Sequence, residues 1–238
     1  MSRTEKILIG KYNYFNSDQI YTQENFYVER IEGRQGELVF HSEVLSRVKN
    51  GEFLKINIEY QVSNKFDPMM VKITRRLGEK ESTELFQINQ KDKTYSYIFK
   101  NKQEVSSFER IITSLPHIAA PCFATSMIMV NQKKIDSVQR TPYTLLHSNN
   151  IWDYVGEFEE KTIYIEMQKL EQQSIMVNDI DLKATHCKLL SVNKNGSIID
   201  DDHEIFLSKH YFIPYEAIFG KDLRISIETL KNLDRKLG

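Results

Sequence analysis

Apolar and polar residues alternate along much of the first hundred positions of this sequence. The clearest run covers residues 53–62, where every second side chain is apolar: Leu54, Ile56, Ile58, Tyr60 and Val62. Because successive side chains of a strand point to opposite faces, this run predicts a strand with one buried and one solvated face. The preceding Asn50-Gly51 pair is typical of a tight hairpin turn, since both residues tolerate positive φ.

Shorter runs of the same kind flank this one, so we expect residues 1–100 to form a meander of antiparallel strands. The alternation returns later in four runs: 162–167, 182–192, 204–207 and 223–227. Another Asn-Gly pair, Asn195-Gly196, predicts a hairpin among them. The sequence therefore predicts two β layers, over about residues 1–100 and 151–230.

The segment that joins the two layers lacks this alternation. We call residues 105–131 the plug segment; its apolar side chains crowd together with few charges. Pro116 and Pro121 interrupt it, and proline ends or kinks a helix. We therefore expect one or two short helices here, packed against the inner face of a curved sheet.

Together these patterns predict a mainly β fold, a curved antiparallel half-barrel or barrel of about ten strands. The chain has 238 residues, a length that one barrel or sandwich often fills, so we expect a single β-rich domain over 1–238. The 12 Tyr and 13 Phe residues suit half-buried strands, because aromatic rings pack well on a pleated surface.

Charge and hydropathy narrow the range of partners. The net charge of −1 gives no general electrostatic reason to expect a nucleic-acid partner. No apolar run approaches the length of a membrane span, and the apolar core of the first residues, 7–9, is too short for a signal peptide. We therefore expect a cytoplasmic protein without an integral membrane segment, whose Cys122 and Cys187 are reduced and buried. The sequence leaves the oligomeric state open.

Several stretches together resemble a known family. They are Tyr12 and Tyr14 in an opening strand, ENFYVER at 24–30, the proline-broken plug segment, 183–189, 202–207 and Ile213-Pro214. On this pattern the chain resembles the LolA/LolB-like half-barrel proteins. The resemblance implies an apolar concave face that binds acyl chains or lipoproteins. Those relatives are usually exported, whereas this sequence shows neither a signal peptide nor a lipobox cysteine.

We accordingly expect a binding protein for an apolar or amphipathic small molecule of the acyl-chain, polyketide or isoprenoid type. The candidate ligand-binding residues are Phe123, Met127, Met129, Tyr12, Tyr14 and Ile58. Methionine thioethers repack around irregular ligands, and a phenol pointing into an apolar cavity can hold a ligand oxygen. The alternative is that the side chains of the plug segment simply fill the core.

A cofactor-independent cyclase or isomerase in the same cavity is the second hypothesis. Its candidate catalytic residues are His186, Tyr60 and Arg75, which would move a proton or stabilise charge. His186 and Cys187 are neighbours on a predicted strand and point to opposite faces, so they cannot act as base and nucleophile. His117 and Cys122 could meet, but a buried structural thiol explains Cys122 more simply.

No motif indicates a cofactor or a metal. The sequence holds no GxGxxG, P-loop, GxSxG or HExxH pattern, so we expect neither. The acidic run at 200–204 lacks the ligand spacing and the glycine of an EF-hand loop, and we interpret it as a solvated turn. The third hypothesis is an interaction scaffold with a filled core and no ligand, which predicts an exposed apolar patch or an unpaired edge strand.

Overall fold

A computed structural model describes residues 4–33, 36–49, 51–112, 115–132, 140–168, 172–177, 179–192, 197–209, 211 and 213–234. These residues form strands almost throughout. The first eight strands are β1 (Thr4–Asn16), β2 (Gln19–Ile31), β3 (Leu38–Arg47), β4 (Phe53–Val62), β5 (Pro68–Leu77), β6 (Lys80–Asn89), β7 (Thr94–Asn101) and β8 (Val105–Ile111). The remaining elements are β9 (His117–Ile118), η1 (Ile128–Asn131), β10 (Thr141–His147), β11 (Glu159–Met167), β12 (Gln173–Val177), β13 (Ile180–Val192), β14 (Ile198–Leu207), β15 (Pro214–Phe219) and β16 (Leu223–Asn232).

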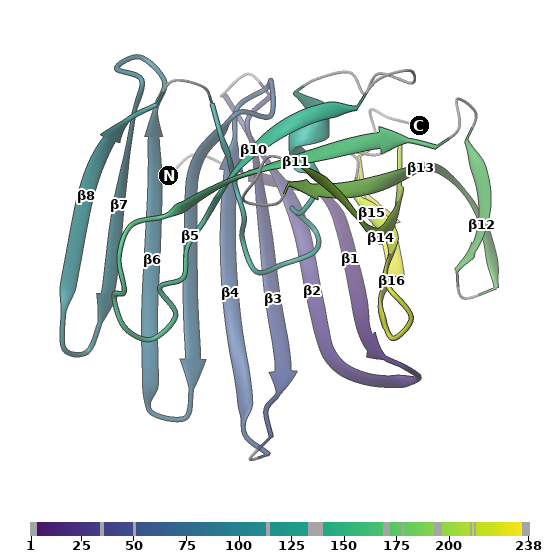
Figure 1. The fold of residues 1–238 in the computed structure, drawn as a ribbon, viewed down its shortest axis with the longest axis horizontal. Coiled ribbons are helices and arrows are strands. Elements are labelled where there is room, and N and C mark those ends of the chain that lie inside the picture. The colour runs from purple at the N-terminus through teal and green to yellow at the C-terminus, as the bar shows by residue number, and fades with distance from the viewer. Residues whose placement is uncertain are drawn as a thin grey trace.

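The strands belong to one large sheet that bends round on itself. Their order is β8-β7-β6-β5-β4-β3-β2-β1-β16-β15-β14-β13-β11-β10-β9, and β12 pairs with β13. Figure 1 shows β1–β8 side by side, with β10, β11 and β13 crossing in front of them. In the described residues β8 and β9 are the two ends of this order, so the sheet is not closed into a barrel. The predicted mainly antiparallel, curved sheet is confirmed.

Alternation explains the long strands. In β4, Ile56, Ile58, Tyr60 and Val62 are buried, while the residues between them are at least partly exposed. The hairpin predicted before β4 has Gly51 at a φ of +87°; Asn50 lies outside the described residues. Asn195-Gly196 also lies outside them.

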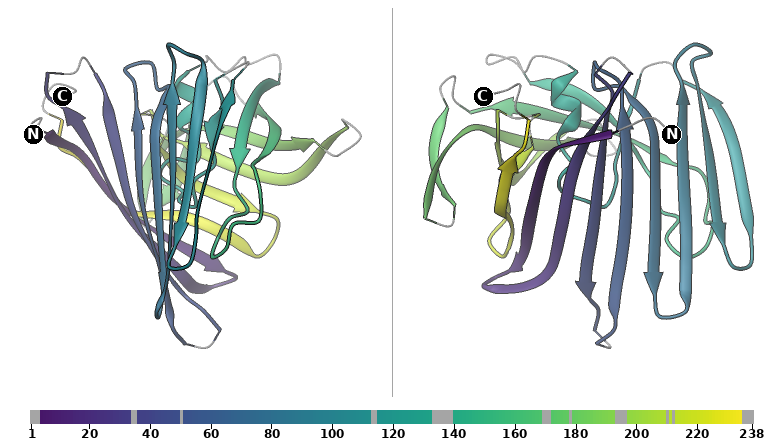
Figure 2. Two further views of the ribbon diagram at one scale, coloured as in Figure 1. Left: turned by 90° about the vertical axis from the view of Figure 1, so that its left-hand side faces the viewer. Right: turned by 180° about the vertical axis from the view of Figure 1, so that it is seen from behind.

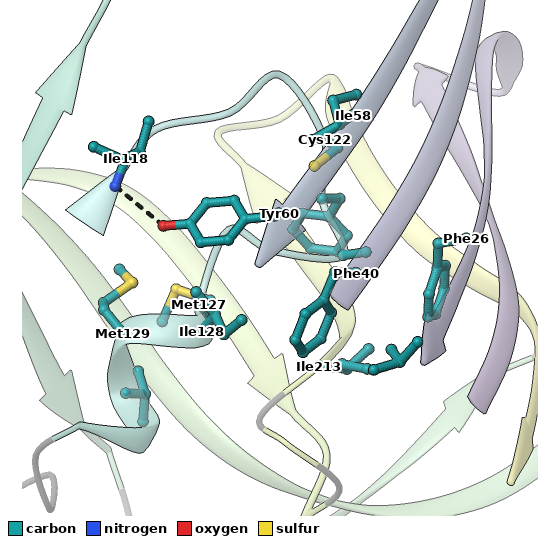
Figure 3. Close-up of a cluster of buried hydrophobic side chains, with 14 of the residues drawn as sticks. Phe26, Phe40, Ile58, Tyr60, Ile118, Cys122, Met127, Ile128, Met129 and Ile213 are labelled. Atoms are coloured by element: carbon teal, nitrogen blue, oxygen red, sulfur yellow. Dashed lines mark hydrogen bonds between the residues drawn. The ribbon is translucent and has the colours of Figure 1, made fainter. Parts of the chain in front are cut away.

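The second half of the plug segment lies inside the bend of the sheet, as Figure 2 shows from two further sides. We call residues 115–132 the inner segment. From Phe123 to Val130 every residue except Ser126 is buried. Figure 3 shows Met127, Ile128 and Met129 opposite Tyr60 and Phe40, which come from the strands β4 and β3. The inner segment thus supplies the core between the two parts of the sheet.

Two expectations about the plug segment need correction. Its first residues, Val105–Ile111, form the edge strand β8 and are largely exposed. The expected short helices are not found in the described residues there, because η1 is only a single 3-10 turn. The backbone from Phe123 to Gln132 instead forms the hydrogen bonds of successive turns. For example, the N–H of Ser126 donates to the carbonyl of Phe123 at 3.1 Å.

A buried carboxylate holds the inner segment in place. Glu24 of β2 accepts hydrogen bonds from the backbone N–H groups of Phe123 (2.7 Å) and Ala124 (3.1 Å). It also accepts them from the hydroxyls of Ser42 (2.7 Å) and Tyr14 (2.5 Å). Burial raises the pKa of Glu24, and these four hydrogen bonds oppose that rise. The backbone N–H groups of Phe123 and Ala124 have no acceptor within a strand or helix, and the Glu24 carboxylate on β2 supplies one.

Candidate functional site

A cavity of about 280 Å³ lies between the inner segment and the strands β10, β11, β13, β14 and β15. We call it the inner cavity. It is lined by His117, Ala119, Ala120, Phe123, Ser126, Met127, Met129, Leu145, Ile163, Leu189, Leu190, Ser191, His203, Ile205 and Phe219. Cross-strand pairing explains the sheet wall, because Leu189, His203 and Phe219 are consecutive partners across β13, β14 and β15.

The lining is mostly apolar. Its polar members are His117, Ser126, Ser191 and His203, and no Lys, Arg, Asp or Glu among the described residues lines it. His203 is only half-buried and meets the ring of Phe219 edge-on, with the ring centres 5.2 Å apart. A cavity of this kind suits an uncharged, largely apolar molecule, because a charge placed in it would lose its hydration without gaining a partner.

His117 is the most deeply buried polar group of the lining, with 3% of its surface exposed. Its Nδ1 lies 3.0 Å from the hydroxyl of Tyr60, and the same hydroxyl accepts a hydrogen bond from the N–H of Ile118 at 3.2 Å. Burial lowers the pKa of His117 to about 3, so the ring is neutral at physiological pH. Burial also raises the pKa of Tyr60, which therefore keeps its proton.

Of the six predicted ligand-binding residues, Phe123, Met127 and Met129 line the inner cavity. The structure places the other three in the surrounding core. The Tyr12 hydroxyl donates to the carbonyl of Pro214 at 2.7 Å, and its ring meets Phe123 edge-on at 5.0 Å. The hydroxyl of Tyr14 donates to Glu24, and Ile58 belongs to the buried cluster of Figure 3.

The three candidate catalytic residues lie in three different clusters. Tyr60 contacts His117, as described above. Arg75 forms a buried ion pair with Glu84 at 2.5 Å, and its guanidinium also donates to the carbonyl of Asn150 at 3.5 Å. His186 stacks on Phe206 with ring centres 4.5 Å apart, and it does not line the inner cavity. The structure therefore does not bring these three side chains together.

The cluster around Arg75 attaches a loop to the sheet. Glu84 accepts a hydrogen bond from the hydroxyl of Tyr97 at 2.7 Å, and that hydroxyl accepts one from the amide of Asn150 at 2.9 Å. The hydroxyl of Ser82 in β6 donates to the carbonyl of Ile151 in the same loop. These contacts are internal to the fold, so they give Arg75 a structural role.

The two cysteines are free and buried, as expected. Cys122 Sγ lies 3.0 Å from the hydroxyl of Thr125. Burial raises the pKa of both the Cys122 and the Cys187 thiol to about 12, so neither is a thiolate at neutral pH. The structure thus favours the structural interpretation of Cys122.

Sequence reasoning overlooked His203 and left His117 out of the candidate residues. The acidic run that contains His203 is not the predicted solvated turn: His203 lies within β14 and shares a face with Ile205. The alternation of His203, Ile205 and Leu207 is the signal that marks this. The side chains of residues 200–202 lie outside what the structure describes. Elsewhere in the described chain, no group of three or more His, Cys, Asp and Glu residues is placed to hold a metal ion.

Comparison with known proteins supports the fold. No protein-family model and no curated protein matches the sequence. A β-barrel-like protein of the domain of unknown function DUF1849 from Brucella abortus has a similar structure. Its TM-score is 0.53 at 10% identity, over 98% of this chain and 100% of that one. A DUF1089 family protein from Pseudomonas aeruginosa gives a TM-score of 0.49 at 8% identity, over 84% of this chain and 90% of that one.

The first of these similarities supports a barrel-like fold. It does not single out the LolA/LolB-like proteins. Within the described part of the chain, no helix combines the length and the apolar character that crossing a membrane requires.

Proposed function

We propose that this protein binds a small apolar or amphipathic molecule in the inner cavity. The observation that supports it is the cavity itself, an apolar space that neither the inner segment nor the sheet fills. The resemblance to LolA/LolB-like half-barrels implies a ligand of the acyl-chain type, and polyketides and isoprenoids share its apolar character. Free cysteines fit a reducing compartment, so we place this activity in the cytoplasm.

The size of the cavity limits the ligand. A cavity of about 280 Å³ is at the lower end of the range of about 300–1,000 Å³ that ligand pockets span, so it suits a small ligand, taken here as about nine non-hydrogen atoms. A long acyl chain would therefore extend beyond the cavity. At roughly 0.5–0.8 kcal/mol of binding free energy per non-hydrogen atom, a ligand of about nine atoms binds with a Kd between about 5 µM and 500 µM.

The test is native mass spectrometry of the protein purified from its own host, followed by extraction of any bound molecule. We expect a co-purifying apolar compound, and we expect it to be lost from an Ala120→Phe variant, whose ring would occupy the cavity. Met176→Phe is the matched control, because Met176 is 65% exposed on β12 and does not line the cavity. An empty protein that fatty acids, polyketides and isoprenoids at millimolar concentration all fail to stabilise against heat would refute the proposal.

We prefer a binding function to the enzyme and scaffold hypotheses because the inner cavity is unfilled and its lining is mostly apolar. An enzyme of the expected kind needs several titratable groups that converge on one cavity, whereas the three candidate residues lie in separate clusters. A scaffold needs no pocket, whereas the inner cavity is an unfilled apolar space beside the core.

A further inference from the structure

The hydrogen bonds around His117 fix which of its nitrogens carries the proton. Because the Tyr60 oxygen already accepts from the N–H of Ile118, its own O–H is free to donate to Nδ1 of His117. With the opposite arrangement the buried Tyr60 oxygen would accept twice and its proton would have no acceptor among the described residues. The neutral imidazole therefore carries its proton on Nε2.

Nε2 has no hydrogen-bond partner among the described residues and is not fully shielded by them, so a molecule in the cavity can reach it. Of the three other polar groups in the lining, Ser126 donates its proton to the carbonyl of Phe123 at 2.8 Å, and Ser191 has an interaction partner of its own. His203 is half-buried, where water competes for its ring nitrogens.

We propose that the ligand of the inner cavity is uncharged and carries one oxygen acceptor, such as a ketone, ester or ether oxygen, which accepts the Nε2–H of His117. This inference rests on the binding function proposed above. An oxygen at this position satisfies the unpaired donor, and the apolar remainder of the molecule contacts Phe123, Met127 and Met129. A carboxylate is disfavoured because no cationic Lys or Arg among the described residues lines the cavity.

Three probes of matched size test this: acetophenone, which has a carbonyl acceptor, α-methylstyrene, which replaces the carbonyl with an apolar alkene, and benzoate, which carries a charge. Affinities are measured by calorimetry or ligand-observed NMR for the wild type and for His117→Phe, which keeps a ring but has no N–H. The ratio of the ketone and hydrocarbon affinities is compared between proteins, because transfer from water by itself favours the hydrocarbon.

The expected result is a ratio about three- to tenfold more favourable to acetophenone in the wild type than in His117→Phe, the size of one neutral hydrogen bond. The ratio is also measured for His203→Phe, because His203 is the other imidazole in the lining. His41→Phe, on β3 and outside the cavity lining, is the matched control and leaves the ratio at the wild-type value. Benzoate does not bind. In the wild type, the infrared carbonyl band of bound acetophenone lies below its position in hydrocarbon solvent, as hydrogen bonding to the oxygen requires; this measurement decides the case if His117→Phe does not fold.

The failures can be told apart. If neither acetophenone nor α-methylstyrene binds at millimolar concentration, the proposed binding function is refuted, and this inference is refuted with it. If both bind with a ratio that His117→Phe leaves unchanged, or with an unshifted carbonyl band, the cavity binds ligands and the role of His117 is wrong. Benzoate binding as tightly as the ketone overturns the requirement for an uncharged ligand, and a ratio lost in His203→Phe assigns the donor to His203.

Discussion

Acid should destabilise the protein through one buried ring, that of His117. Its pKa is about 3 in the folded protein because burial disfavours the charged imidazolium, whereas an unfolded histidine titrates near 6.5. The unfolded chain therefore binds this proton more readily than the folded one. The stabilising contribution is complete above pH 6.5 and is lost as the pH falls toward 3.

The two pKa values set the magnitude. The linkage relation gives a loss in unfolding free energy of about 2 kcal/mol between pH 7 and pH 5, and about 3 kcal/mol by pH 4. Other groups add their own pH dependence: burial lowers the pKa of His147, which acts in the same direction, and raises the pKa of Glu24, which acts in the opposite one. The contribution of His117 must therefore be measured as a difference between two proteins.

The assay is urea unfolding at pH 7, 6 and 5, followed by far-ultraviolet circular dichroism, for the wild type and for His117→Asn. The asparagine oxygen can still accept from the hydroxyl of Tyr60, but the side chain does not titrate. We expect the variant to be less stable at pH 7 and to lose about 2 kcal/mol less than the wild type on going to pH 5. Parallel losses, within about 0.5 kcal/mol, would show that the ring is hydrated or already charged, and the reasoning from its burial would be wrong.

Three further predictions concern stability measured by urea unfolding at pH 7. Arg75→Met leaves the charge of Glu84 buried without its partner and should cost about 3–5 kcal/mol, most of which Arg75→Met combined with Glu84→Leu should restore; an equally unstable double variant would contradict this. Glu24→Gln places an amide N–H₂ against hydrogen-bond donors and should cost about 3 kcal/mol, with a wild-type value refuting the anchoring role. Gly10→Ala brings a methyl to 2.3 Å from the Phe26 ring and should cost about 1–3 kcal/mol in the wild type, but less in a Phe26→Leu background, where that clash is relieved; an equal cost in both backgrounds would contradict this.

The strands were predictable because each long strand has one solvated face and one buried face. In β4 the alternation alone identifies which side chains are buried. Val105–Ile111 lacks this alternation, and for that reason the sequence alone places it in the plug segment. As an edge strand with little covering it, β8 has no buried face to impose a period of two, so its sequence does not show that it is a strand.

The polar interior was harder to predict. Glu24, Arg75 and Glu84 all occupy inward positions of alternating strands, which is visible in the sequence as a charge in step with apolar neighbours. What the sequence does not show is the partner, since Glu24 binds backbone groups about a hundred positions away, at Phe123 and Ala124. Such pairings depend on how the strands assemble, and no local pattern encodes that.

The outer edge of β8 has no partner strand among the described residues, and an unpaired edge is one feature that the scaffold hypothesis predicts. Ile111 is 80% exposed and Val105 is 66% exposed on this strand. Neighbouring charges on Glu109 and Arg110, which are exposed as well, discourage edge-to-edge association. The edge is thus protected in the way that monomeric sheets commonly are.

Because β1 pairs with both β2 and β16, the order of synthesis has a consequence for folding. The ribosome releases β1–β8 well before β16, so only the inner segment is available to cover the apolar side of the first meander until the last third of the chain emerges. The hydrogen bond from Tyr12 to Pro214 closes a loop across 202 positions. A topology with contacts this distant in sequence folds slowly, and the partly folded chain is prone to aggregation. We therefore expect nascent chains to depend on chaperones more than the folded protein does.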